Sequence, residues 1–285
     1  FGAQDDNGLF RTVHCAAFLS VILGLLACVC GLLLSTPLLR WADAPEDVLP
    51  LSVLYLRIYF LGVPALVVYN FGSALLRAVG DTFYPLLFMI VSGALNVAMN
   101  LLLVVVIPLD VAGVAIATSV SQLLSAVLVT VRLCTFRGPC RLDLRKIRLY
   151  PDRTGQMLRL GFSARLQGVI FSAANVMIQS AINSFGSVVM AGSSAASGIE
   201  NFVHTALNTF YQSAITFTGQ SMGASDPRRA VRVFQINLAL TTGLGIVLCA
   251  LAQIFQVPLL GLYVQSSDPA YDAVIAAGVV RVLAL

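Results

Sequence analysis

The stretch VVMAGSSAASGIENFVHTALNTFYQSAITFTG, from Val188 to Gly219, decides how this chain must fold. It is long enough to cross a bilayer, because a helix rises about 1.5 Å per residue and the hydrocarbon core is about 30 Å thick. Yet it is rich in Ser, Thr, Asn and Gln, and Glu200 near its middle is the one acid in the chain that must lie at membrane depth. The stretch therefore predicts a membrane helix that faces a water-filled path inside a helix bundle, since lipid could not satisfy these groups.

The composition of the whole chain agrees with a membrane location. The 285 residues are 58% hydrophobic and 11% charged, with a mean hydropathy of +0.90, whereas soluble domains carry about 25% charged residues. Long uncharged runs, rather than alternating strands of about ten residues, favour an all-α polytopic membrane protein. The chain starts without Met, and its polar first residues do not resemble a signal peptide, so we expect a fragment.

Charged and turn residues divide the chain into eight predicted spans. Four precede a basic, proline-containing segment at 135–157, so we expect first-lobe helices in 1–134, a linker at 135–157 and second-lobe helices in 158–285, with the last span truncated. The predicted spans are residues 12–39, 51–76, 84–107, 114–131, 158–182, 188–219, 230–259 and from 273 onward.

The basic residues predict the orientation of these spans. If the linker is cytoplasmic, thirteen of the seventeen Lys and Arg residues fall on the cytoplasmic side, as the positive-inside rule requires. The net charge of +4 then follows from topology, and no nucleic-acid partner is needed to explain it. The six Cys lack CxxC spacing and His14 and His204 lie far apart, so we expect neither disulfides nor a metal site, and a structural role for His14.

The chain also repeats itself. Matched Gly, Pro, Asp and Arg residues recur in the same order, which relates the first two spans to the last two and predicts a duplicated transporter with about twelve spans in the full protein. At an offset of 221 residues the matches are Gly2-Ala3 with Gly223-Ala224, Asp5 with Asp226, Arg11 with Arg232 and Pro37-Leu38-Leu39 with Pro258-Leu259-Leu260; at 224 they are Pro45 with Pro269 and Arg57 with Arg281.

Several motifs are those of a known family. YLRIYFLGVP (Tyr55 to Pro64) and FGSALLRAVGDTFYP (Phe71 to Pro85) resemble the multidrug and toxic compound extrusion (MATE) family. Two further patterns resemble its bacterial branch. The first is LQ followed after ten residues by IQSAINSFGS (Leu166 to Ser187), and the second is IENF with GQSMGA (Ile199 to Ala224). The resemblance implies two six-helix lobes around a V-shaped cavity, of which this chain would hold the third to the tenth helix. It also implies export of cationic or amphipathic compounds in exchange for Na⁺ or H⁺.

Glu200 is the first candidate for the chemistry. A carboxylate at this depth could bind a coupling cation, exchange a proton or attract a cationic drug. The alternative is a structural partner for an Arg or for backbone donors. Arg165, on the neighbouring span, lies nearer the cytoplasmic end. The repeat-related Arg57 and Arg281 are expected to have a structural duty near helix ends.

The resemblance adds a second candidate in the first lobe. Many family members form a cation site from an Asn-x3-Asp pair and a Thr on the next helix, together with an Asp on the first helix. Here Asn96 and Asn100 occupy the pair and Thr118 fits the Thr position. Asn100 stands where an Asp is common, which puts the site in doubt. The alternative is an amide clasp between helices.

Amides in the second lobe suggest a polar wall along a substrate cavity. Helical spacing places members of the set on shared faces, although some could simply pack helices together. The expected cavity residues are Gln167, Asn175, Gln179, Asn183, Asn208 and Gln212.

These observations favour a secondary multidrug antiporter, a monomer with several spans in the plasma (inner) membrane, surrounded by lipid. The alternative is a flippase for lipid-linked oligosaccharides or peptidoglycan precursors of the same superfamily. We expect more basic cavity residues in such a flippase. We expect no enzyme activity, because the chain has no HExxH, clustered acids or Ser/His pair. We expect no cofactor beyond the coupling ion, Na⁺ or H⁺.

Overall fold

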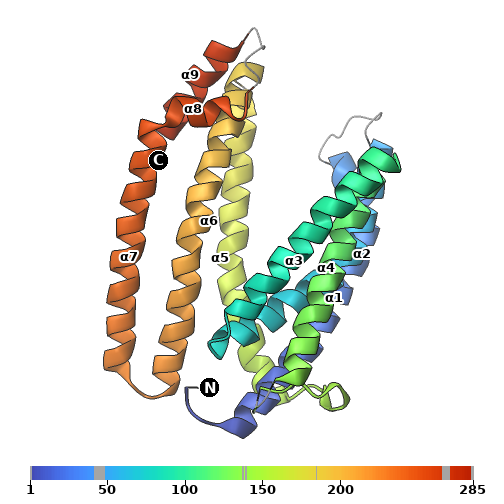
Figure 1. Ribbon diagram of the computed structural model, residues 1–285, viewed down its shortest axis with the longest axis vertical. Coiled ribbons are helices and arrows are strands. Elements are labelled where there is room, and N and C mark those ends of the chain that lie inside the picture. Colours follow the sequence, from blue (N-terminus) through green and yellow to red (C-terminus); the bar gives the residue numbers. More distant parts are fainter. Residues whose placement is uncertain are drawn as a thin grey trace. The chain divides into compact units, whose positions relative to one another are not determined.

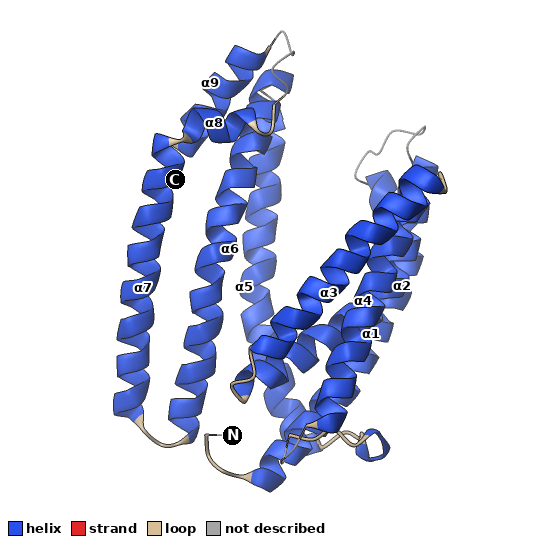
Figure 2. Ribbon diagram, viewed as in Figure 1, coloured by secondary structure: helices blue, strands red, loops and turns tan. Residues whose placement is uncertain are grey.

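A computed structural model describes residues 2–41, 49–136, 138, 140–183, 185–264 and 270–283. Every regular element in these ranges is a helix (Figure 2). The repeat pair Pro45 and Pro269 lies outside the described residues, and so do the side chains of Arg165, Gln167 and Asn183. The chain divides into two compact units, Ala3–Met157 and Leu158–Leu285.

The first unit is a helical bundle with a folded linker (Figure 1). Helix α2 packs along both α1 and α4, and α3 packs along α4. The elements are α1 (Asp6–Trp41), α2 (Leu49–Ala78), α3 (Phe83–Asn100), the π-helix η1 (Leu101–Val106), α4 (Asp110–Thr135), the 3₁₀ turn η2 (Leu144–Lys146) and the beginning of α5 (Pro151–Asn183).

The linker folds back onto the core of this unit. Cys140 and Leu142 are buried in the same cluster as Val13, Leu76 and Val129. Burial raises the pKa of the Cys140 thiol, which keeps it protonated and unreactive.

His14 fixes the linker to α1. Its ring is fully buried; Nδ1 donates to the carbonyl oxygen of Phe10 at 2.8 Å, and Nε2 accepts the backbone N–H of Asp143 at 3.1 Å. This pattern requires the neutral tautomer with its proton on Nδ1. The structural role predicted for His14 is therefore confirmed.

An ion pair ties the α2–α3 turn to the end of α4. The Nη2 atom of Arg132 lies 2.8 Å from Oδ2 of Asp81, and its guanidinium lies 3.8 Å from the ring centroid of Tyr84. Planar stacking on an aromatic face suits Arg better than Lys. The contact fixes where α3 starts relative to α4.

The second unit is organised around the stretch that opened the sequence. Helix α6 packs along α7 and α9, and α8 lies against α9. The buried core comes from Ala195, Ala196 and Ile199 of α6 with Leu260 and Val282. The elements are the remainder of α5, α6 (Ser187–Gly223), α7 (Pro227–Ile254), α8 (Gln256–Gly261) and α9 (Tyr271–Val282).

The single span predicted at 230–259 is interrupted in the structure. Helix α7 ends at Ile254, and α8 starts at Gln256 after a break at Phe255. Pro258 explains the break, because a proline cannot donate to the carbonyl four residues earlier, here that of Ile254, and its ring clashes with it. The repeat-related Pro37 is accommodated within continuous α1.

The backbone confirms that the two loops matched by the repeat are built alike. Gln4 and Ser225, which are 221 positions apart, have φ values of 51° and 56°. The next residues are acids that cap helices: Asp5 Oδ1 accepts the Gly8 N–H and Asp226 Oδ1 accepts the Arg229 N–H, at 2.9 and 3.0 Å. Equivalent sequence positions thus have the same turn and the same cap.

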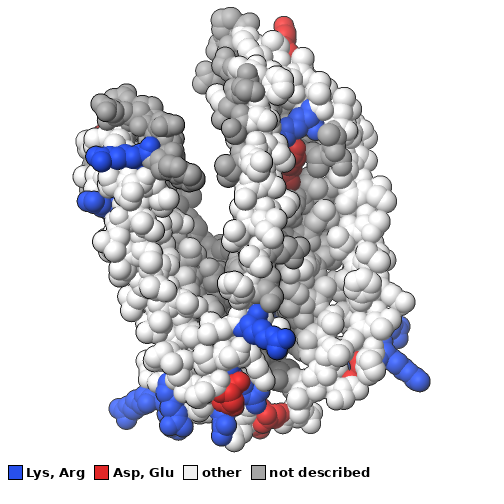
Figure 3. All heavy atoms as spheres, turned by 180° about the vertical axis from the view of Figure 1, so that it is seen from behind, with Lys and Arg blue, Asp and Glu red and all other residues white. Residues whose placement is uncertain are grey.

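Five helices in the described ranges are long and apolar enough to cross a membrane: α1, α2, α3 continued by η1, α4 and α7. Large apolar side chains cover the outside of both units, and the charged side chains visible in Figure 3 gather mainly toward helix ends. The protein is an all-α polytopic membrane protein. Helix α6, predicted as a span at 188–219, is not among these five, because its Ser, Thr, Asn and Gln residues lower its hydropathy.

A close approach of two helix backbones in the second unit gives a test of its packing. A Cβ atom at Gly192 would lie 2.5 Å from the carbonyl oxygen of Val274 and 2.8 Å from the backbone nitrogen of Gly278. A Cβ at Gly219, on the same helix, would meet nothing within 4 Å. Helix propensity alone favours Ala over Gly by about 1 kcal/mol at either position.

We therefore expect Gly192→Ala to lower the melting temperature of the detergent-solubilised protein, because α9 must move away from α6. The matched variant Gly219→Ala should leave it unchanged or raise it. Equal melting curves for the two variants would show that the α6–α9 contact is not tight.

Candidate functional site

Glu200 forms a two-pronged ion pair with Arg281. Nε and Nη2 of Arg281 donate to Oε1 and Oε2 of Glu200, both at 2.8 Å. The side chains are 32% and 28% exposed, so the pair is neither dry nor freely solvated. Such fork geometry is the strongest common arrangement between Arg and a carboxylate.

Ser193 completes the surroundings of Arg281. Nη1 donates to the Ser193 hydroxyl and also to its carbonyl oxygen at 3.3 Å. Ser193 and Glu200 lie two helical turns apart on α6, and Arg281 comes from the end of α9. The guanidinium therefore joins the two helices through three α6 groups.

The ion pair with Arg281 affects how Glu200 can bind a cation or a proton. Each carboxylate oxygen accepts one hydrogen bond from Arg281 and keeps a second lone pair, and the side chain is 32% exposed, so a cation or proton that binds Glu200 would weaken its attraction to Arg281. The sequence allowed for an Arg partner but pointed to Arg165 as the nearby one, and the structure identifies Arg281. The repeat had singled out Arg281 with Arg57 as arginines with a structural duty near helix ends, but it gave no link between Arg281 and Glu200.

The structure describes the side chains of four of the six expected cavity residues. The amides of Asn175, Gln179, Asn208 and Gln212 all lie on exposed faces of α5 or α6. Exposure is compatible with a cavity lining. The role expected for the set remains a prediction.

In the first unit, Asn96 and Asn100 form a chain of amide hydrogen bonds. Nδ2 of Asn100 donates to Oδ1 of Asn96 at 3.1 Å, and Nδ2 of Asn96 donates to the Ser121 hydroxyl at 3.3 Å. That hydroxyl donates in turn to the carbonyl oxygen of Thr118, at 2.8 Å. The arrangement is an amide clasp between α3 and α4, and sequence reasoning missed Ser121.

One acceptor of this amide clasp has no hydrogen-bond partner, and the Thr118 hydroxyl takes no part in the clasp. Thr118 contributes its carbonyl, because its hydroxyl donates to Val114 of its own helix at 2.9 Å. Oδ1 of Asn100 is buried without a hydrogen-bond partner in the described part of the chain. Buried acceptors are almost always satisfied, so this oxygen is a position where a proton donor or a cation would be stabilised.

A π-helix follows the clasp directly. Residues Leu101–Val106 form η1, and Asn100 precedes its first turn. Helix α4 lies against it at Gly113, where a Cβ would be 2.8 Å from the carbonyl oxygen of Leu103. Isolated π-turns inside helices recur at functional sites, and the apolar sequence LLLVVV gave no sign of this one.

Comparison with known proteins identifies the family. The MatE family model matches residues 1–102 and 164–285. This chain belongs to the MatE family. Its members are transporters and not enzymes, which agrees with the prediction from the sequence.

Two bacterial relatives illustrate the range of the MatE family. The probable multidrug resistance protein YoeA of Bacillus subtilis (strain 168) is 25% identical over 280 residues, which cover 96% of this chain and 60% of YoeA. A FAD transporter of Shewanella oneidensis is 26% identical over 265 residues, covering 90% of this chain and 57% of that protein. The chain thus spans about 60% of the length of these relatives.

Solved structures show the same fold. A MOP superfamily transporter from Pyrococcus furiosus superposes with a TM-score of 0.90 at 20% identity, over 98% of this chain and 62% of that one. An outward-facing multidrug resistance MATE transporter gives a TM-score of 0.88 at 20% identity, over 98% of this chain and 63% of that one. The two-bundle MATE/MOP-type architecture expected from the sequence is confirmed.

The ion pair predicts a pattern of coupled stability losses. Removing one partner leaves the other charge without compensation inside the unit, so Glu200→Gln and Arg281→Gln should each cost about 2 kcal/mol. The double variant should cost less than the sum of the two. Thermal unfolding in detergent gives the three values, and Asp272→Asn, which removes an exposed acid at the start of α9, is the matched control. Strict additivity would mean that the two side chains do not interact.

Proposed function

We propose that this MatE chain is part of a secondary antiporter that exports cationic or amphipathic small molecules in exchange for Na⁺ or H⁺. The single observation that carries the proposal is Glu200, a carboxylate in the middle of α6 that forms a partly exposed ion pair with Arg281. Multidrug resistance proteins among the relatives support the substrate class.

The mechanism follows from competition for the carboxylate. In one state Arg281 neutralises Glu200 through two hydrogen bonds. A coupling cation or proton that binds Glu200 releases the guanidinium, which loosens the contact between α6 and α9. An ion that prefers one of two conformations shifts the population toward it, and alternating access requires such a shift.

The clasp in the first unit would serve as a second polar position for the coupling ion. Asn96 and Asn100 supply neutral oxygens, and the unpaired Oδ1 of Asn100 is the free ligand. Amide oxygens without a carboxylate suit Na⁺ better than H⁺, because an amide does not take up a proton near neutral pH. We further propose a monomer in the plasma membrane, with residues 135–157 in the cytoplasm.

One observation favours a second candidate, the export of an anionic substrate. Arg57 is exposed on α2 and makes no ion pair with the described residues, and one relative is a FAD transporter. The flippase alternative gains no support from the relatives compared above.

Transport by the full-length protein in proteoliposomes tests the leading proposal. We expect ethidium efflux to be driven by an inward Na⁺ or H⁺ gradient. Glu200→Gln should abolish the gradient dependence, with at least tenfold slower efflux, because a neutral amide cannot exchange a charge. Asp272→Asn, an exposed acid on α9, should transport normally.

Full gradient-driven efflux by a folded Glu200→Gln protein would refute the coupling role. FAD efflux without ethidium efflux would favour the anionic substrate instead.

A further inference from the structure

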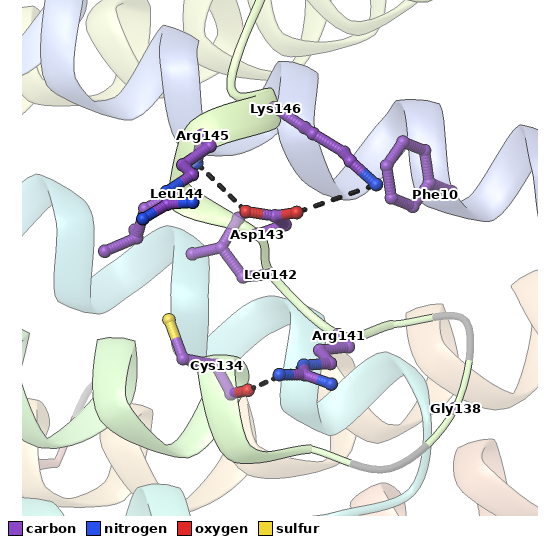
Figure 4. A pocket seen from close by; sticks show the side chains of 9 residues that line it. All are labelled: Phe10, Cys134, Gly138, Arg141, Leu142, Asp143, Leu144, Arg145 and Lys146. Carbon is purple, nitrogen blue, oxygen red and sulfur yellow. Dashed lines mark hydrogen bonds and ion pairs between the residues drawn. The ribbon is translucent and has the colours of Figure 1, made fainter.

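The linker forms a basic pocket that the transport proposal does not use. It has a volume of about 610 Å³, and Figure 4 shows its lining, with Arg141, Arg145 and Lys146 as its cations and Phe10 and Leu144 among its apolar walls. Volumes of a few hundred to a thousand Å³ are typical of small-ligand sites. We call this site the linker pocket.

Positive charge predominates in the linker pocket. Its one carboxylate, Asp143, accepts the backbone N–H of Arg145 at 3.0 Å and lies 3.6 Å from Nζ of Lys146. The Arg145 N–H, followed by the Lys146 charge, lowers the pKa of Asp143, so the carboxylate stays ionised. Three cations against one anion leave two positive charges unbalanced.

The pocket is built on a fixed backbone. Nε of Arg141 donates to the carbonyl oxygen of Cys134 at 3.1 Å, and the backbone N–H of Leu142 donates to Leu133 at 3.0 Å. The N–H of Asp143 donates to the buried ring of His14. These contacts hold the cation-bearing segment in place before any ligand arrives, which reduces the entropy lost on binding.

The pocket also lies at the end of a helix that is apolar enough to cross a membrane. Cys134, in the last turn of the spanning helix α4, lines it. Leu144 and Leu149 are 59% and 47% exposed beside the cations. Exposed leucines interleaved with Arg and Lys match the boundary between headgroups and acyl chains, where apolar side chains enter the lipid and cations meet phosphate.

We propose that the linker pocket binds the phosphate headgroup of an anionic phospholipid. Arg141 and Arg145 donate to the phosphate oxygens, Lys146 adds charge, and Leu144 contacts the acyl chains. Bound lipid would hold the linker against the bilayer. This site is separate from Glu200, and the inference does not depend on the transported substrate.

Native mass spectrometry of the full-length protein, with added phosphatidylglycerol or phosphatidylcholine, tests the proposal. We expect selective retention of phosphatidylglycerol, weakened by salt. Each cation near a membrane surface strengthens binding about fivefold, so the triple variant R141Q/R145Q/K146Q should bind about 100-fold more weakly. Arg148→Gln is the matched control, because Arg148 belongs to the same segment but stacks on Tyr150, at 4.9 Å, outside the pocket.

The single variants Arg145→Gln and Lys146→Gln, whose side chains are exposed, keep the test decisive if the triple variant does not fold. Each should lose about fivefold in affinity while Arg148→Gln does not. Equal retention of the two lipids, or equal losses in the pocket variants and the control, would overturn the proposal. Displacement of phosphatidylglycerol by millimolar inorganic phosphate would also overturn it, in favour of a site for a soluble phosphate compound.

Discussion

A charge that is partly buried among apolar helices needs a partner, and in the second unit the ion pair between Glu200 and Arg281 meets this requirement. Glu200 and Arg281 lie on helices far apart in sequence, so their pairing holds α6 against α9. Ser193 adds a third anchor, and Gly192 lets the two backbones approach. The same contact that stabilises the unit occupies the carboxylate, so structure and coupling chemistry compete for one group.

In the first unit, the polar side chains that meet between helices are neutral. Asn96, Asn100 and Ser121 satisfy one another across α3 and α4, which costs less than burying a charge. The clasp leaves one acceptor unpaired, and the backbone changes to a π-helix at that point. The two units have equivalent capped turns at Asp5 and Asp226, while their polar sites differ.

Patterns along the sequence were enough to predict the all-α membrane fold. Long apolar intervals predicted the spanning helices because backbone groups in lipid must bond within their own segment. Positions 221 residues apart predicted equivalent turns, and the matching φ values of Gln4 and Ser225 confirm them. The sequence did not predict the break at Phe255. Pro37, at the equivalent position of α1, interrupts nothing, so whether a proline interrupts a helix depends on its packing.

By itself the sequence determined the all-α membrane fold, the repeat and the presence of an acid that needs a partner, since these follow from composition and spacing. Only the tertiary structure decided which partner it has. Arg281 is 81 residues from Glu200 along the chain, and no periodicity links residues on different helices. The Ser121 contact and the folding of the linker around His14 were hidden for the same reason: side chains meet through packing, which spacing along one helix does not specify.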